Sequence, residues 1–132
     1  MIRLSSIKDD LAKQREGDWV TFRGNWPEPV QFKVRSTESP AFKMAFEKLL
    51  VALRQKHGDE PTPPDELQSK LGALYAEHLL LDWQGLDEPY TPELALQVLT
   101  DPAYREVTNA IHWCATRVGQ AKIQLIEAAA KN

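Results

Sequence analysis

The side chains that most often take part in chemistry are few in this chain, which has three histidines and one cysteine. His57, His78 and His112 lie far apart, and none has a second metal ligand at an HExxH-like spacing. His112 and Cys114 are close in the segment HWC, but side chains two residues apart on a helix point about 200° apart. They therefore cannot form a nucleophile–base pair by themselves. Cys114 also continues the apolar spacing of its segment and is expected in the core.

Carboxylates are plentiful, but they stand where helices begin. Acidic side chains at these positions cap free N–H groups and complement the helix dipole, and nothing in the sequence singles out two of them as a catalytic acid–base pair. The phosphate-binding and nucleophile motifs GxxxxGK[ST], GxGxxG and GxSxG are missing from the chain. We therefore expect a protein that is not an enzyme and has no cofactor and no metal. The carboxylates at predicted helix starts are Asp9, Asp10, Asp65, Glu66 and Asp101.

The size and composition are those of an ordinary globular domain. The chain has 132 residues, of which 42% are apolar and 27% charged, so we expect one domain, 1–132. It has no apolar run of about 18 residues and no amino-terminal secretory pattern, so it should stay off membranes and inside the cell that makes it. A single cysteine fits a reducing compartment.

The net charge of −3 is unevenly distributed. Residues 1–57 carry eleven Lys and Arg against seven Asp and Glu, or +4, whereas residues 58–132 carry five against twelve, or −7. Such a split can serve a polar partner or a head-to-tail contact between copies, although a mild basic excess is usually only surface.

The first third of the chain predicts a short helix and a hairpin. Leu4, Ile7 and Leu11 recur at helical spacing over residues 4–16, which Gly17 ends. The segments DWVTF and VQFKVR then show strand composition, and a turn rich in Gly, Asn and Pro joins them. A two-stranded antiparallel hairpin at about 18–35 is the result, and it needs a helix to cover it.

The remainder, about 40–130, reads as helices. Ser39, Pro40 and Gly58 mark the two ends of the first helix. A second helix is expected from 65 to 81, a short third one over 91–100, and a last helix of nearly thirty residues from 101 onward. Each has one apolar stripe and needs a partner. The predicted fold class is mainly α: a small bundle of three to five helices with the two-stranded hairpin near the amino terminus.

The hairpin offers one alternative function. Its aromatic and basic side chains are the kinds that stack on bases and follow a phosphate backbone, which would suit a small nucleic-acid-binding regulator. However, acidic neighbours dilute the charge, and aromatic side chains in a two-stranded sheet usually pack against a helix. Nucleic acid is therefore the less favoured partner. The residues concerned are Trp19, Phe22, Trp26, Phe32, Arg23, Lys33 and Arg35.

The link LDWQGLDEPYTPELA, 81–95, is unusually apolar for a connector. Trp83, Leu86 and Tyr90 can fold over the ends of the flanking helices, and some of that apolar surface can remain available to a partner. In the longer segment, Trp-x-Gly-Leu precedes a Tyr-Thr-Pro-Glu helix start, and an Asp-Pro-x-Tyr step follows. This order, together with EGDWVTF and FKVRSTES earlier, resembles the tail assembly chaperones of long-tailed, siphovirus-type bacteriophages or prophages over most of the chain, about 18–118.

The resemblance implies a role in binding. Such proteins keep the tape measure protein soluble, help tail tube subunits to gather around it, and leave before the virion matures, so the host cytoplasm is the expected location. A client helix would lie in an apolar groove, and self-association as a homo-oligomer is possible. The turn LDEPY is shorter here than in many relatives. The residues expected to bind the partner are Trp83, Leu86, Tyr90, Leu94, Val98 and Tyr104.

The carboxy-terminal AAAKN gives one hypothesis about the gene. In the chaperone family a −1 ribosomal slip near the end of the gene usually makes a longer product, and an A-rich heptamer can encode 130–132. The codons of the gene show whether such a heptamer is present, so sequencing the gene tests the hypothesis.

Overall fold

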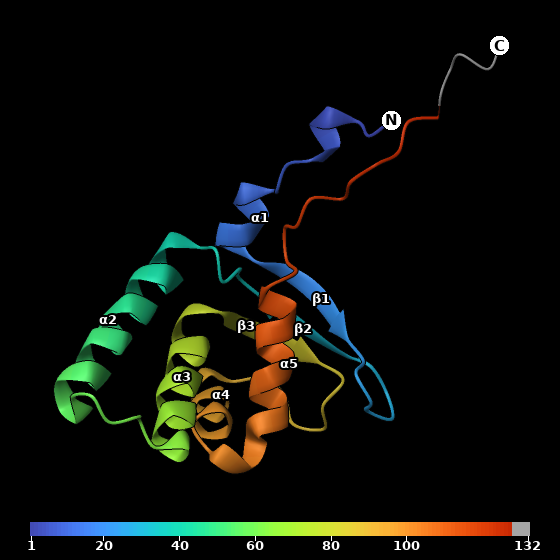
Figure 1. Cartoon of the computed structure of the whole chain (residues 1–132). Helices are drawn as coiled ribbons and strands as arrows, with labels where there is room; N and C mark the ends of the chain where they lie inside the picture. Colours follow the sequence, from blue (N-terminus) through green and yellow to red (C-terminus); the bar gives the residue numbers. More distant parts are fainter. Residues whose placement is uncertain (128–132) are drawn as a thin grey trace.

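The computed structural model describes residues 1–127 and shows a mixed α/β architecture rather than a mainly helical bundle (Figure 1). Three antiparallel strands form one sheet in the order β1-β2-β3: β1 (Asp18–Phe22), β2 (Val30–Val34) and β3 (Leu80–Gln84). The first two strands are the expected hairpin. The prediction of a two-stranded element was nevertheless wrong, because a third strand from the middle of the chain pairs with β2.

The third strand comes from residues that were assigned to a helix end and a link. The helix before it stops at His78, and the apolar run that follows is extended. Along the β2–β3 ladder Phe32 lies opposite Trp83 and Lys33 opposite Asp82, so an aromatic pair and an opposite-charge pair stabilise the register. Helical spacing alone did not distinguish this short apolar run from a continuation of the helix.

Of the four helices of eight or more residues, α3 and α5 contact the sheet directly, whereas α2 and α4 pack mainly against other helices. Of these, α5 contacts β1 and β2 whereas α3 contacts β3, and α2 lies at the edge with α3 as its main neighbour (Figure 1). Side-chain caps begin the later elements: Thr91 Oγ1 accepts a hydrogen bond from Leu94 N at 3.0 Å, and Asp101 Oδ1 accepts one from Ala103 N at 2.9 Å. The elements are α2 (Pro40–His57), α3 (Pro64–His78), α4 (Pro92–Leu99), the 3₁₀ turn η2 (Pro102–Tyr104) and α5 (Arg105–Ala115).

One hydrophobic core lies between the sheet and the helices. Phe32 and Val34 of β2, Leu99 of α4 and Ile111 of α5 have no exposed surface, and Cys114 joins them as expected. Strands β2 and β3 and all four long helices contribute buried side chains to the core, α2 through Phe42, and β1 adds partly buried ones. This shared packing fixes where the residues between β3 and α5 are held.

Both ends of the chain differ from the predicted helices. The expected helix over 4–16 is split into the 3₁₀ turn η1 (Leu4–Ser6) and α1 (Leu11–Glu16), and the expected apolar stripe of Leu4, Ile7 and Leu11 is exposed. The last helix ends at Ala115 instead of continuing for nearly thirty residues, and Gly119 with φ +70° lies in the turn that follows.

Beyond that turn the chain runs back beside its own amino terminus. Arg3 N donates to Gln124 O at 2.9 Å and Ile126 N to Met1 O at 2.7 Å, and Ile2 bridges Leu125. These two segments, residues 1–8 and 120–126, are called the terminal arm below. The arm extends away from the rest of the molecule (Figure 1). Residues 130–132, on which the frameshift hypothesis depends, lie outside the described residues. No helix in the described part of the chain is both long and apolar enough to cross a bilayer.

Candidate partner-binding groove

The six residues expected to bind a partner lie close together at one end of the fold. A small hollow of about 170 Å³ opens between the turn after β3, the exposed side of α4, and η2. Tyr90 does not line the hollow but packs behind it against Trp83. This hollow and its rim are called the groove. It is lined by Trp83, Leu86, Asp87, Glu88, Leu94, Val98, Tyr104 and Val107.

Trp83 is the anchor of the groove. It is the last buried residue of β3, with only 6% of its surface exposed. Its indole Nε1 donates a hydrogen bond to Glu88 O at 2.8 Å, and its ring meets Tyr90 edge-to-face at a centroid distance of 5.3 Å. The hydrogen bond satisfies the one polar atom of a buried indole, and it holds the loop between β3 and α4 against the strand.

The loop itself exposes a leucine. Gly85 has φ +102°, a conformation that L side chains rarely adopt, and it allows the chain to turn directly after β3. Leu86 follows at the tip with 37% of its surface exposed. Because Trp83 fixes the base of this loop, Leu86 projects at the edge of the groove and not into the core.

Helix α4 supplies the floor. Leu94 and Val98 are four residues apart and so lie on one face of the helix, half-buried and facing the groove, whereas Ala95 and Leu99 on the other face are fully buried. Gly72 of α3 permits this position of α4, because a Cβ at Gly72 would lie 1.7 Å from Leu99 O. The backbones of α3 and α4 are therefore in direct contact.

The opposite wall begins at η2. The cap of Asp101 fixes this turn, and Tyr104 at its end keeps 46% of its surface exposed. Val107, one turn further along in α5, completes the wall. An exposed Tyr ring beside aliphatic side chains is a common feature of protein-binding surfaces.

The lining of the groove is mostly apolar, and its charged members are the carboxylates of Asp87 and Glu88. Residues 82–104 contain five acidic side chains and no Lys or Arg. Burial, followed by the carboxylates of Asp82 and Glu93, raises the pKa of Tyr90 above its usual value, so this phenol stays neutral. The five acidic residues are Asp82, Asp87, Glu88, Glu93 and Asp101.

The histidines and the cysteine have structural surroundings. His112 Nδ1 lies 3.0 Å from Tyr75 Oη, and His57 Nε2 lies 3.0 Å from Glu66 Oε1. Cys114 is fully buried, and burial raises the pKa of its thiol to about 12. Among the described residues no three His, Cys, Asp or Glu side chains come together as a metal site.

Three of the four aromatic side chains of the hairpin, Phe22, Trp26 and Phe32, are used in packing. Phe22 meets Trp26 at 4.9 Å and Trp113 at 5.5 Å between ring centroids, and Trp26 meets Phe32 at 6.5 Å. A stacking platform for bases needs exposed ring faces, and Phe32 has no exposed surface at all.

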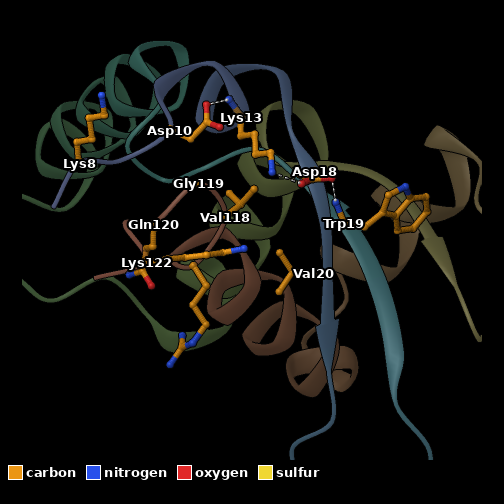
Figure 2. A pocket seen from close by; sticks show the side chains of 11 residues that line it. Lys8, Asp10, Lys13, Asp18, Trp19, Val20, Val118, Gly119, Gln120 and Lys122 are labelled. Carbon is orange, nitrogen blue, oxygen red and sulfur yellow. Dashed lines mark hydrogen bonds and ion pairs between the residues drawn. The ribbon is translucent and has the colours of Figure 1, made fainter. Parts of the chain in front are cut away.

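A second, polar hollow of about 370 Å³ lies where the first helix meets the end of α5 (Figure 2). Lys13 Nζ pairs with Asp18 Oδ2 at 3.4 Å, while Asp10 caps α1 by accepting from Lys13 N at 3.1 Å. A hydrogen bond from Trp19 N, followed by Lys13, lowers the pKa of Asp18. Lys8 and Lys122 also line this polar hollow (Figure 2). The sequence did not predict this hollow, because its walls come from opposite ends of the chain and share no local pattern.

A comparison with known families decides the broad identity of the chain. Residues 37–132 match the family model described as YdaY prophage protein. The chain belongs to the YdaY family of prophage proteins. The match includes the groove and leaves β1 and β2 outside. The YdaY-family chain matches no curated protein and no solved structure. A phage or prophage origin, part of what the sequence predicted, is thereby confirmed.

Proposed function

We propose that this YdaY-family protein is a non-enzymatic tail assembly chaperone that binds the tape measure protein in its groove. It would keep that client soluble and help to recruit tail tube subunits in the cytoplasm of the bacterial host. It would then leave before the virion is complete. The observation that carries the proposal is the groove, because an apolar hollow between well-packed elements is a surface that a helix with an apolar stripe can fill.

The order of motifs in the sequence supports this assignment. The segment from Trp83 to Tyr104 resembles the corresponding part of tail assembly chaperones, and the same segment forms most of the groove. Prophage origin is consistent with such a client. The proposal thus joins a resemblance in residue order with a surface built by those residues.

The dimensions favour a side chain over a small ligand. Pockets for small molecules usually enclose about 300–1,000 Å³, whereas this hollow measures about 170 Å³. A client helix would place one or two apolar side chains between Leu86 and Val98. Lys or Arg residues beside that stripe would face the acidic rim, which favours encounter and correct register.

Weak contacts between one copy and the client are consistent with a chaperone that must later be released. One small hollow supplies few contacts, so a single copy should bind reversibly, and many copies on one long helical client would raise the overall avidity. Assembly of the tail tube could then displace the copies one at a time.

Co-expression provides the test. The tape measure protein of the same prophage is expressed alone, with the wild-type chain, and with Leu86→Arg, which puts a cation at the exposed edge of the groove. The soluble fraction of the client should rise with the wild type and fall back with Leu86→Arg. Leu50→Arg is the matched control, since Leu50 is also exposed but lies on α2. Equal client solubility with and without the wild-type chain would overturn the proposal.

A further inference from the structure

The terminal arm exposes more large apolar side chains than any other part of the described chain. Six of them are each at least 50% exposed, whereas a lone exposed leucine elsewhere is ordinary. A two-stranded ladder with little packing is marginal in water, so this surface is expected to gain from being covered. The six residues are Met1, Ile2, Leu4, Ile7, Ile123 and Leu125.

The charged side chains of the arm are cations, and Asp9 and Asp10 follow at its base, where Asp9 Oδ1 accepts a hydrogen bond from Ala121 N. Within residues 1–8 and 120–126 the charged side chains are Arg3, Lys8 and Lys122, with no Asp or Glu. Leu4 is 83% exposed and Ile7 50%, and they lie between Arg3 and Lys8 in the sequence. The arm therefore presents apolar side chains bordered by cations.

The groove also exposes apolar side chains, but the charged side chains beside them are acidic. Its mostly apolar lining includes the carboxylates of Asp87 and Glu88, and no Lys or Arg lines it. The arm and the groove lie toward opposite ends of the molecule (Figure 1), so a contact between them joins two molecules.

We propose that the arm of one copy docks into the groove of a second copy, with Leu4 and Ile7 against Leu86 and Val98. Arg3 and Lys8 then face the acidic rim, where Asp87 and Glu88 lie. Because the two surfaces differ, the contact is head-to-tail, and repeating it gives a ring if the rotation closes or an open chain if it does not. This association needs no client and goes beyond the proposed function.

The experiment uses two variants, each with one defective surface. Leu4→Glu places a carboxylate in the arm, and Leu86→Arg places a cation in the groove. Both positions are exposed, so both variants should fold, which circular dichroism and thermal unfolding check. Leu50→Glu and Leu50→Arg introduce the same charges on α2 as controls.

Sedimentation velocity then measures the mass from about 1 µM to about 1 mM, the range of weak reversible contacts. The wild type and both controls should rise above the 15.0 kDa monomer as concentration increases. Each single variant should need about tenfold or more higher concentration to associate. An equimolar mixture of the two variants should associate at a lower concentration than either variant alone, because the Leu86→Arg chain has an intact arm and the Leu4→Glu chain an intact groove.

Three results would overturn the proposal. One is a wild type that stays monomeric throughout, and another is a mixture no heavier than its separate components. The third is self-association lost with Leu4→Glu but retained with Leu86→Arg, which would mean that arm pairs with arm. The client test is separate, since Leu4→Glu should still keep the tape measure protein soluble while Leu86→Arg should not.

Discussion

The core beneath the sheet and the groove beside it use the same kinds of side chain in different ways. Phe32, Leu99 and Ile111 have no exposed surface, because a strand or helix covers them on every side. Leu86 and Tyr104 are 37% and 46% exposed, because no element of the described chain lies over them. Residue type alone does not separate the two regions, whereas the presence of a covering element does.

Because the core is covered and the groove is exposed, substitutions in the two regions should have different effects on stability and binding. In the core, stability depends on close packing, and a lost side chain leaves a cavity. In the groove, an exposed side chain adds little to the folded state and remains available to another molecule. Substitutions should therefore separate stability from binding.

The largest expected effect concerns the thiol of Cys114, which is buried in the core, and compares the folded protein with the unfolded chain. Burial raises its pKa from 9.0 to about 12, while the positive charge of Arg117 acts in the opposite direction. Below pH 9 the folded protein should hold about a thousandfold less thiolate than the unfolded chain, so alkylation by iodoacetamide at pH 8 should be much slower in the folded protein. The native and urea-unfolded proteins are compared by mass spectrometry.

The same shift has a defined effect on stability. Because the folded state keeps its proton while the unfolded chain ionises, the contribution of Cys114 is complete below pH 9 and declines as pH rises toward 12. Equal alkylation rates in the native and unfolded proteins would contradict the buried position.

Phe32→Ala should cause the largest loss of stability among single substitutions. Phe32 is fully buried at the centre of the sheet, opposite Trp83, and its truncation should cost about 3–5 kcal/mol. Urea denaturation measures the free energy of unfolding. Leu50→Ala on the exposed side of α2 is the control and should change it by less than about 0.5 kcal/mol. Similar losses in both variants would remove the distinction between covered and exposed residues.

Gly72→Ala tests the close approach of α3 to α4. The new Cβ would lie 1.7 Å from Leu99 O and 2.4 Å from Leu99 C, so the backbone of α4 must move. We expect a loss of about 1–3 kcal/mol and a change in the tryptophan fluorescence of the groove. An exposed helical glycine would respond in the opposite way and gain about 1 kcal/mol. Such a gain would show that α3 and α4 are further apart.

Local signals in the sequence were sufficient for several elements. Ser39, Pro40 and Gly58 correctly predicted the bounds of α2, although the Ser39 side chain makes no capping hydrogen bond. Thr91 correctly predicted the start of α4, where its hydroxyl accepts from Leu94 N. The paired strands β1 and β2 were also correct, since a short turn joins them. Five of the six residues expected to bind a partner line the groove, since they come from one continuous segment, 83–104, and their role in binding stays a prediction.

Features that depend on distant residues were not predicted. Strand β3 is a strand because β2 offers it an edge, and the run LLLDW carries no period that separates it from a helix. The early end of α5 depends on the return of the chain toward residues 1–8, about 115 residues away in sequence. The polar hollow depends on the same juxtaposition. Tertiary pairing, and not local propensity, decided these three features.

Trp83 lies between the core and the groove, and Trp83→Phe tests its hydrogen bond to the loop after β3. It keeps an aromatic ring in the core but removes the donor to Glu88 O, so we expect a loss of about 1 kcal/mol and faster amide exchange in the 85–90 loop. Trp113→Phe is the matched control, because Trp113 is 37% exposed at the surface of α5. If the loop exchanges at the wild-type rate in Trp83→Phe, the indole does not hold it in place.

Leu86→Ser should have the smallest effect on stability and still reduce binding. Because Leu86 is exposed at the loop tip, its truncation should change the free energy of unfolding by less than about 0.5 kcal/mol. Yet the proposed function predicts that the client solubility conferred by co-expression should fall, since the leucine borders the hollow that is proposed to receive a client side chain. Leu96→Ser provides the control: Leu96 is 48% exposed on α4 but does not line the groove. Equal losses of client solubility in Leu86→Ser and Leu96→Ser would mean that general surface hydrophobicity, and not the groove, holds the client. The groove would then differ from the core in exposure but not in binding.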